Sequence, residues 1–344
     1  MTDISTILII DHSVETLDLI GGALRAQYRV LTANSAEVGL LLAGKQPKPH
    51  LIVLSENMPD IGAGNLLTLL RENPASSETP ILLLTEHDSE LDCQHALQLG
   101  LMDFISKPIK PAALLARVRL QIDITQLLAE NKLVQQTTIR ALAHLAELSD
   151  PETSNHILRT SGYVRHLANS LLQHPRFIKF LTRPIIDAIA QSAALHDIGK
   201  IAISDNILLK SGKLMPEEWG VMKTHALLGS QAISKAMRGI KPPVPLLVLA
   251  KEIAHWHHEK WDGSGYPDGL VGDAIPISAR LMALADVFDA LINARVYKPA
   301  MTNAEAREII IAGRGKHFDP DMVDAFIEHF DDFVAIAKKY QDIS

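Results

Sequence analysis

Short apolar runs recur at regular intervals through the first 120 residues, and the stretches between them are amphipathic. The runs are Ile7–Ile10, Val30–Leu31, Leu51–Leu54, Ile81–Leu84 and Met102–Ile105. Short buried strands that alternate with amphipathic helices are typical of a parallel sheet with helices on both faces. The pattern therefore predicts a doubly wound α/β domain over residues 1–120, with a five-stranded parallel sheet.

Polar residues follow or close four of these predicted strands. They are Asp11, Ser55, Thr85 and Lys107, the last of which precedes Pro108. The carboxyl ends of parallel strands meet at one edge of an open α/β sheet, and ligands bind at that edge. We expect these side chains to lie close together.

The segment from Pro111 to Asp150 is rich in helix formers, with no glycine and no proline after its first residue. It predicts a linker helix over residues 121–145. A heptad seam runs along it through Leu120, Ile124, Leu127, Asn131, Val134, Thr138, Ala141 and Leu145. Two interpretations stay open: a coiled coil that forms a homodimer, with Asn131 fixing its register, or a connecting helix packed against its own domains.

From residue 146 to residue 344 the apolar positions recur at helical spacing, which predicts an all-α second domain. The length of 344 residues, 47% apolar and 21% charged, suits two globular domains. No stretch approaches the roughly 20 apolar residues of a membrane span, so a cytoplasmic protein without a membrane partner is expected. The net charge of −7 argues against nucleic-acid binding.

Histidines and carboxylates cluster in the second half of the chain. "HDIGK" places His196 beside Asp197, with Lys200 one helical turn beyond. The other members of the set are Glu152, His156, His225, His257, His258 and Asp286. Imidazole and carboxylate are usual ligands of divalent metals, and these donors suffice for two six-coordinate ions that share a bridge once water completes their shells.

The first 120 residues resemble the receiver domain of bacterial response regulators through "ILIID", "LIVLSENMPDIGAG", "PILLLTE" and "DFISKP". Ser55 stands where that family carries the phosphoacceptor Asp, and His12 replaces one of two Mg²⁺-binding acids. Thr85, Phe104 and Lys107 match the phosphate-sensing positions. The resemblance implies a degenerate receiver used for docking or dimerisation, unless Glu56 faces the pocket as a permanent negative charge.

Residues 140 to 335 resemble the HD-GYP family, a branch of the HD phosphohydrolases, through "DPETSNH", "ALHDIGK", "NILLKSGKL", "HHEKWDGSGYPDGL", "DVFDALINARVYKPA" and "HFDP". The resemblance implies two or three divalent ions, iron or manganese. His156, His196, Asp197 and Asp286 would hold one ion. Asp197 would bridge to a second, held by His225, His257 and His258, and Glu152 would serve a third.

The family resemblance also implies an activity: metal-activated hydroxide would open cyclic di-GMP to the linear dinucleotide, with GMP as a further product left open. Asp197 and Lys200 would be catalytic, and Arg295 and Lys298 would contact substrate phosphates. Tyr266 either binds substrate or packs.

Two other functions stay open: hydrolysis of another cyclic dinucleotide, such as a mixed GMP-AMP ring, and a non-catalytic metal-bound receptor that signals through protein partners. Several histidines are expected at surface or capping positions instead of in the metal set. These are His144, His166, His174 and His329.

Overall fold

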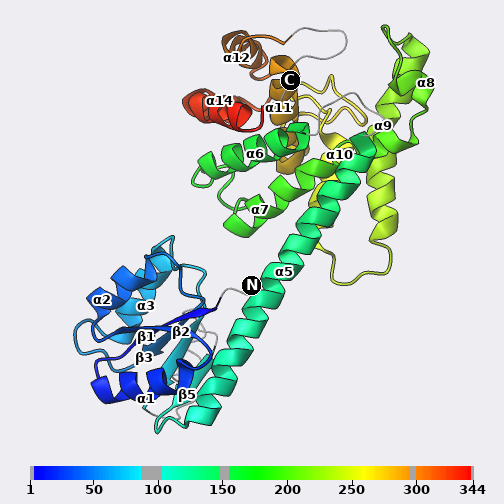
Figure 1. Ribbon diagram of the computed structural model, residues 1–344. Helices are drawn as coiled ribbons and strands as arrows, with labels where there is room; N and C mark the ends of the chain where they lie inside the picture. Colours follow the sequence, from blue (N-terminus) through cyan, green and yellow to red (C-terminus); the bar gives the residue numbers. More distant parts are fainter. Residues whose placement is uncertain (1–3, 87–102, 148–154, 294–299, 342–344) are drawn as a thin grey trace. The chain divides into compact units, whose positions relative to one another are not determined.

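Helix α5 (Pro111–Glu147) contains the boundary between the two units into which the chain divides, Met1–Leu133 and Val134–Ser344 (Figure 1). The predicted linker, residues 121–145, lies within this single helix. The computed structural model describes residues 4–86, 103–147, 155–293 and 300–341.

The first unit contains a five-stranded parallel sheet, which confirms the predicted α/β fold. The strands follow the spatial order β2-β1-β3-β4-β5, so the order reverses direction between β1 and β3. Their bounds are Thr6–Ile10 for β1, Arg29–Ala33 for β2, Leu51–Ser55 for β3, Ile81–Thr85 for β4 and Asp103–Ser106 for β5. A reversal of this kind opens a crevice at the carboxyl edge of the sheet.

Helices cover both faces of the sheet, as alternation along β1 requires. Ile7 and Ile9 point to the face covered by α1 (Val14–Leu24) and the start of α5, whereas Leu8 and Ile10 point to the opposite face. That second face is covered by α2 (Ala36–Ala43) and α3 (Ala63–Glu72) (Figure 1). These four apolar side chains of β1 are fully buried. Burial on both faces explains why the strand is a continuous apolar run.

The second unit is helical, which confirms the predicted all-α domain. Its helices after α5 are α6 (Asn155–Ser170), α7 (Arg183–Ser192), α8 (Asp205–Leu208), α9 (Pro216–Ala236), α10 (Pro245–Trp256), α11 (Ile277–Ile292), α12 (Asn303–Ala312), α13 (Pro320–Glu328) and α14 (Phe330–Lys339). Aromatic side chains fill the centre of the core. Tyr163 on α6 stacks on Phe333 of α14 with ring centroids 5.2 Å apart, and its ring edge meets Phe288 of α11. These contacts join α6, α11 and α14 around one core.

Helix α5 is buried near its two ends and exposed in between. Leu114 and Val118 pack under the sheet, and Ala143 belongs to an apolar cluster of the second unit. In the middle, Leu127 and Val134 of the predicted seam are 64% and 56% exposed. Within each unit, the described residues leave these two side chains largely uncovered. None of the described helices combines the length and apolar character needed to cross a membrane.

Candidate functional site

The "HDIGK" segment forms a tight turn between two short 3-10 helices, Ala193–Leu195 and Ile198–Ala202. His196 and Asp197 lie between them. Gly199 packs directly against α9: a Cβ at this position would lie 2.0 Å from the carbonyl oxygen of His225. Only glycine permits this approach, and the approach brings His225 next to Asp197.

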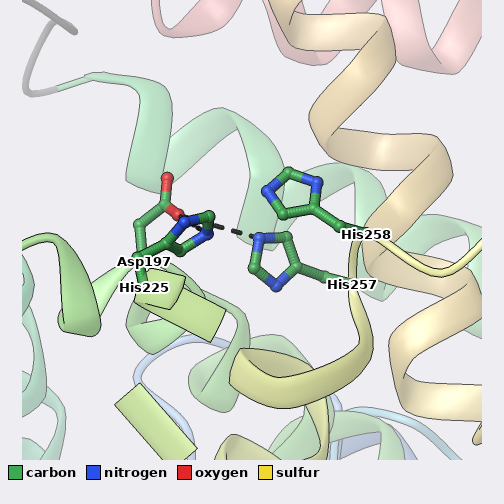
Figure 2. A group of neighbouring side chains, drawn as sticks. All are labelled: Asp197, His225, His257 and His258. Carbon is green, nitrogen blue, oxygen red and sulfur yellow. Dashed lines mark ion pairs between the residues drawn. The ribbon is translucent and has the colours of Figure 1, made fainter. Parts of the chain in front are cut away.

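The side chains of one group come from three elements. Asp197 comes from the turn, His225 from α9, and His257 and His258 from the residues that follow α10 (Figure 2). Each offers a ligand atom, and these atoms lie within 4.8 Å of one another. Asp197 Oδ1 is 3.2 Å from His225 Nε2 and 3.7 Å from His257 Nε2. The group presents imidazole and carboxylate donors to one point.

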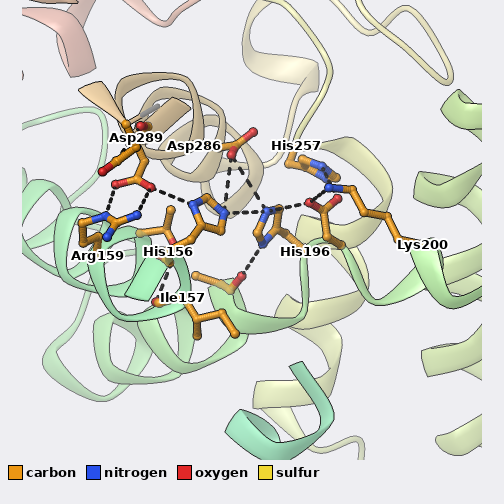
Figure 3. A network of polar contacts seen from close by, with 12 residues as sticks. His156, Ile157, Arg159, His196, Lys200, His257, Asp286 and Asp289 are labelled. Atoms are coloured by element: carbon orange, nitrogen blue, oxygen red, sulfur yellow. Dashed lines mark hydrogen bonds and ion pairs between the residues drawn. The ribbon is translucent and has the colours of Figure 1, made fainter. Parts of the chain in front are cut away.

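A second group of possible ligands lies beside the first. His156 of α6, His196 and Asp286 of α11 also offer ligand atoms within 4.8 Å of one another (Figure 3). The Nε2 atoms of the two histidines are 3.5 Å apart, and Asp286 Oδ1 is 3.7 Å from that of His156. Asp197 connects the groups, because its other oxygen, Oδ2, is 3.2 Å from His196 Nε2.

Hydrogen bonds fix which nitrogen of these histidines faces inward. The Nδ1 atoms of His196, His225 and His257 lie 2.8 to 2.9 Å from the backbone carbonyls of Ala193, Met222 and Ile253. A carbonyl only accepts, so each Nδ1 carries a proton. Nε2 is then the nitrogen of each ring that points toward Asp197.

The polar atoms at the centre fit a divalent metal. Asp197 Oδ1, His225 Nε2 and His257 Nε2 are buried, and they have no hydrogen-bond partner among the described residues. A buried polar atom without a partner costs free energy, which a metal ion would offset by taking their lone pairs. Nitrogen and carboxylate donors suit zinc, iron or manganese.

Comparisons with known proteins agree with both halves of the structure. The family model described as HD domain matches residues 140–322, and the one described as response regulator receiver domain matches residues 7–119. The chain belongs to the HD domain family. HD domains are metal-dependent hydrolases, so the predicted combination of a receiver with a metal-dependent hydrolase is confirmed.

Several curated relatives are similar to most or part of the chain. A "Probable cyclic di-GMP phosphodiesterase" of Vibrio cholerae serotype O1 is 42% identical over 99% of this chain and 82% of its own length. The "Cyclic di-GMP phosphodiesterase response regulator RpfG" of Xanthomonas campestris is 37% identical over 80% of this chain and 74% of its own length. A "3'3'-cGAMP-specific phosphodiesterase 2" of Vibrio cholerae is 42% identical over 58% of this chain and 36% of its own length.

A carboxylate and an arginine orient His156 in the HD domain. His156 Nδ1 is 2.8 Å from Asp289 Oδ2, and Asp289 accepts two further hydrogen bonds from Arg159 (Figure 3). Asp289 was not identified from the sequence, although it stands one helical turn after Asp286 in the "DVFDAL" block. The partnership with His156 spans 133 residues, which local spacing could not reveal.

Charge around Asp197 determines its ionisation. Burial opposes the charged carboxylate, but Lys200 and His196 outweigh it and hold the pKa of Asp197 well below its ordinary value. Lys200 Nζ lies 2.7 Å from Asp197 Oδ2. Burial lowers the pKa of His257, and burial together with His257 and His225 lowers that of His258 further. Both histidines are therefore neutral at pH 7, as a metal ligand must be.

The residues that follow "GSGYP" are hydrogen-bonded to the end of the metal-facing segment. Glu259, which follows His258, is buried and accepts hydrogen bonds from the backbone N–H groups of Asp268, Gly269 and Leu270. Its fastening role was not anticipated from the sequence. Tyr266 lies in this loop with its ring 4.7 Å from that of His258, and it is half-buried.

Three predicted site residues lie outside the described residues. Glu152 falls within 148–154, and Arg295 and Lys298 fall within 294–299. His255 lies three residues before His258 but is not among the predicted ligands, and both of its ring nitrogens contact other groups. Nδ1 is 2.7 Å from Ser230 Oγ, and Nε2 is 3.1 Å from Asp268 Oδ2.

The receiver domain gathers its polar strand-end residues around Lys107. The ammonium lies 3.6 Å from Asp11 Oδ2 and 3.5 Å from Ser55 Oγ. It also lies 3.3 Å from Glu86 Oε1, a contact not anticipated from the sequence. Ser55 is fully buried. Lys107 therefore pairs with two carboxylates, those of Asp11 and Glu86. The position that corresponds to the phosphoacceptor holds the hydroxyl group of Ser55.

Glu56 and His12 make backbone contacts at the rim of this pocket. Glu56 Oε2 accepts a hydrogen bond from the N–H of Glu86, and His12 Nδ1 donates to the carbonyl of Asn57 at 2.7 Å. Ser55, not Glu56, contacts Lys107. Alternation along β3 thus points the Ser55 side chain at Lys107, as expected if the strand register has not slipped by one residue.

Proposed function

We propose that this chain is a metal-dependent phosphodiesterase that hydrolyses cyclic di-GMP to the linear dinucleotide. The observation that carries the proposal is Asp197, whose two oxygens face two separate groups of imidazole and carboxylate donors. A bridged pair of sites suits hydrolysis of a phosphodiester. The relatives from Vibrio cholerae and Xanthomonas campestris, named for cyclic di-GMP, support the choice of substrate.

In this proposal, two divalent ions, iron or manganese, would be held by the two groups. They would supply a water of lowered pKa and neutralise charge that grows on the phosphoryl oxygens. Lys200 has two roles. It keeps Asp197 ionised, and its ammonium, 2.7 Å from the carboxylate, is placed to orient a substrate phosphate or to protonate the leaving oxygen.

The substrate contacts belong to the same proposal. Tyr266 lies over His258 and is half-buried, so its exposed edge would contact a base or ribose next to the ions. Arg295 and Lys298 would bind the phosphates, for which the planar fork of arginine is suited. Glu152 would hold a third ion and influence whether hydrolysis continues to GMP.

A second candidate substrate is a mixed GMP-AMP ring. Metal and phosphate contacts do not distinguish the bases, and one relative of this chain is named for 3'3'-cGAMP. A metal-bound receptor without turnover is the third candidate. This candidate is disfavoured because a receptor without turnover could have lost metal ligands. The seven predicted ligands that the structure describes are all present in the two groups.

The test combines metal counting with substrate discrimination. Purified full-length protein is analysed for bound metals and incubated with cyclic di-GMP, 3'3'-cGAMP and cyclic di-AMP, and the products are separated. Asp197→Ala should lose at least one ion and all turnover, whereas Asp205→Ala, an exposed residue of α8, should retain both. Full turnover by Asp197→Ala with full metal content would contradict the proposal.

The proposal includes a homodimer formed through α5. Leu127 and Val134 of the seam are exposed, so these apolar side chains are available to pack against a second copy of the helix. Receiver docking or dimer geometry would then replace phosphorylation as the control of activity. Leu127→Asp should dissociate the dimer in light-scattering measurements. Leu128→Asp is the matched control, since Leu128 is equally exposed at 63% but lies off the seam. Equal masses for both variants and the wild type would exclude this arrangement.

A further inference from the structure

A histidine pair and a carboxylate lie together on the HD domain away from the residues of the proposed catalytic groups. His166 comes from α6, His329 from the junction of α13 with α14, and Asp332 from the first turn of α14. Their ligand atoms lie within 4.8 Å of one another. We propose that these three residues form a peripheral binding site for a single transition-metal ion of the zinc class.

The distances between the three side chains suit one small ion. Asp332 Oδ2 lies 3.3 Å from His166 Nε2 and 3.7 Å from His329 Nδ1. With bonds of about 2.0 to 2.1 Å to nitrogen and oxygen, ligands at the corners of a tetrahedron are separated by about 3.3 Å. The two rings, 5.4 Å apart and inclined by 73°, approach the carboxylate from different directions. Water would occupy the fourth position.

The nitrogen of His166 that faces the carboxylate has no hydrogen-bond partner within the described parts of the chain. Nε2 is buried although the ring as a whole is 31% exposed. The site therefore already contains a buried nitrogen ligand atom next to a carboxylate, and a metal ion would bind the lone pair of that nitrogen. Half of the Asp332 side chain stays exposed, so an ion and its water have a route in from solvent.

An ordinary ion pair between a protonated His166 and Asp332 does not account for the arrangement as well. Burial lowers the pKa of the His166 ring, and the neighbouring His329 adds to this effect, against the opposing effect of Asp332. His166 is consequently neutral at pH 7. The macrodipole of α14 explains why an acid occupies its first turn, but it gives no reason for two imidazoles to converge on that acid.

An ion at this site would cross-link two elements that support the catalytic groups. Helix α6 carries His156 and Arg159, and Arg159 also donates a hydrogen bond to the carbonyl of Tyr340 just after α14. The proposed ion would tie the other end of α14 to α6. Zinc binding should therefore raise the stability of the HD domain without taking part in turnover, because none of the three residues belongs to the catalytic groups.

The experiment measures zinc stoichiometry on the full-length protein. Wild type, His329→Gln, His166→Gln and Asp332→Asn are dialysed against the same micromolar Zn²⁺ solution, and bound zinc is measured by elemental analysis. Each variant should bind one Zn²⁺ fewer per chain than the wild type. Asp331→Asn is the matched control: it removes the neighbouring exposed carboxylate of the same helical turn and should bind the wild-type amount.

Thermal unfolding and turnover give independent readings. Added Zn²⁺ should raise the melting temperature of Asp331→Asn more than that of Asp332→Asn, while turnover of manganese-loaded Asp332→Asn should match the wild type. Equal zinc content in Asp332→Asn, Asp331→Asn and wild type would overturn the proposed site. So would an equal loss of zinc in both Asp variants. These outcomes are independent of the diesterase assay, so this site and the proposed function can fail separately.

Discussion

His156 donates a hydrogen bond from Nδ1 to Asp289 Oδ2 at 2.8 Å, and Asp289 in turn accepts a bidentate pair of hydrogen bonds from Arg159. Hydrogen bonds from His156 and Arg159 overcome the effect of burial and lower the pKa of Asp289. The carboxylate is ionised and can only accept, so it fixes the His156 tautomer with Nε2 unprotonated. A carboxylate behind a ligand histidine orients the ring and raises its basicity.

Replacing Asp289 by Asn should weaken metal binding at the His156 group. The amide can still accept from His156, but it loses the charge and turns an N–H group toward Arg159, so metal affinity or activity should fall roughly 10- to 100-fold. Metal titration and turnover measure the effect. Asp324→Asn is the control, because Asp324 accepts the same bidentate pair from Arg314 on the surface. Equal behaviour of the two variants would show that Asp289 does not act through His156.

Replacing Gly199 by Ala should separate α9 from the "HDIGK" turn. The new Cβ would lie 2.0 Å from the His225 carbonyl oxygen, so the backbone must move, at a cost of about 1 to 3 kcal/mol or more. Metal at the His225 group should be lost first. Gly220→Ala in α9, where a Cβ has open space, should instead stabilise the protein by about 0.5 to 1 kcal/mol. Urea unfolding and metal content provide both measurements, and a fully stable, fully loaded Gly199→Ala would refute the packing argument.

Small phosphodonors should leave the receiver domain unmodified and its activity unchanged. Ser55 cannot form an acyl phosphate, and Lys107 already contacts the carboxylates of Asp11 and Glu86. An input changes a two-state equilibrium only if it binds the two states differently, and without an acyl phosphate the receiver domain has no such input from phosphodonors. The protein is treated with acetyl phosphate and Mg²⁺, then intact mass and diesterase rate are read together. A stable added phosphate with a change in rate would disprove the degenerate assignment.

Acid should destabilise the HD domain partly through His317. Burial, followed by the charge of Lys260, lowers the pKa of His317 from 6.5 to about 4. Between these values the unfolded chain binds the proton and the folded chain does not. His317 therefore contributes stability that is present above pH 6.5 and is lost as the pH falls to about 4, by up to about 3 kcal/mol.

His317→Gln removes this titration. The free energy of unfolding, measured in urea at several pH values, should decline less steeply between pH 6.5 and pH 4 than in the wild type. Lys260→Met should make the decline smaller and end it at a higher pH, because removal of the nearby cation raises the pKa of His317 in the folded protein toward 6.5. Parallel curves for all three proteins would show that the acid sensitivity arises elsewhere.

The sequence predicted the sheet and the HD domain well because both leave local or family-wide signals. Continuous apolar runs predicted β1, β3 and β4, since burial on both faces favours apolar side chains along these strands. Hydrogen-bond partners far apart in sequence were harder to predict. Asp289, Glu259 and Glu86 were all inside or next to recognised motifs, but their roles depend on which distant group each meets, and no periodicity encodes that choice.

The coiled-coil seam shows a different limit. Heptad spacing identified Leu127 and Val134 as members of a possible interface, and exposure agrees that their own chain leaves them uncovered. Heptad spacing alone could not distinguish a helix that packs against its own domains at its two ends from a helix whose middle forms a coiled coil with a second chain. The seam and the packed positions share one helix but occupy different stretches of it, so packing at the two ends of α5 leaves pairing along its middle as a prediction.

The three backbone N–H groups that donate to Glu259 bear on the rate at which ligands dissociate. Three hydrogen bonds to a buried carboxylate restrict this part of the loop before any ligand arrives. If Tyr266 contacts substrate as proposed, less affinity should be lost to ordering the loop. Discrimination between ligands should accordingly appear in how quickly each one leaves instead of in a slow step of closure.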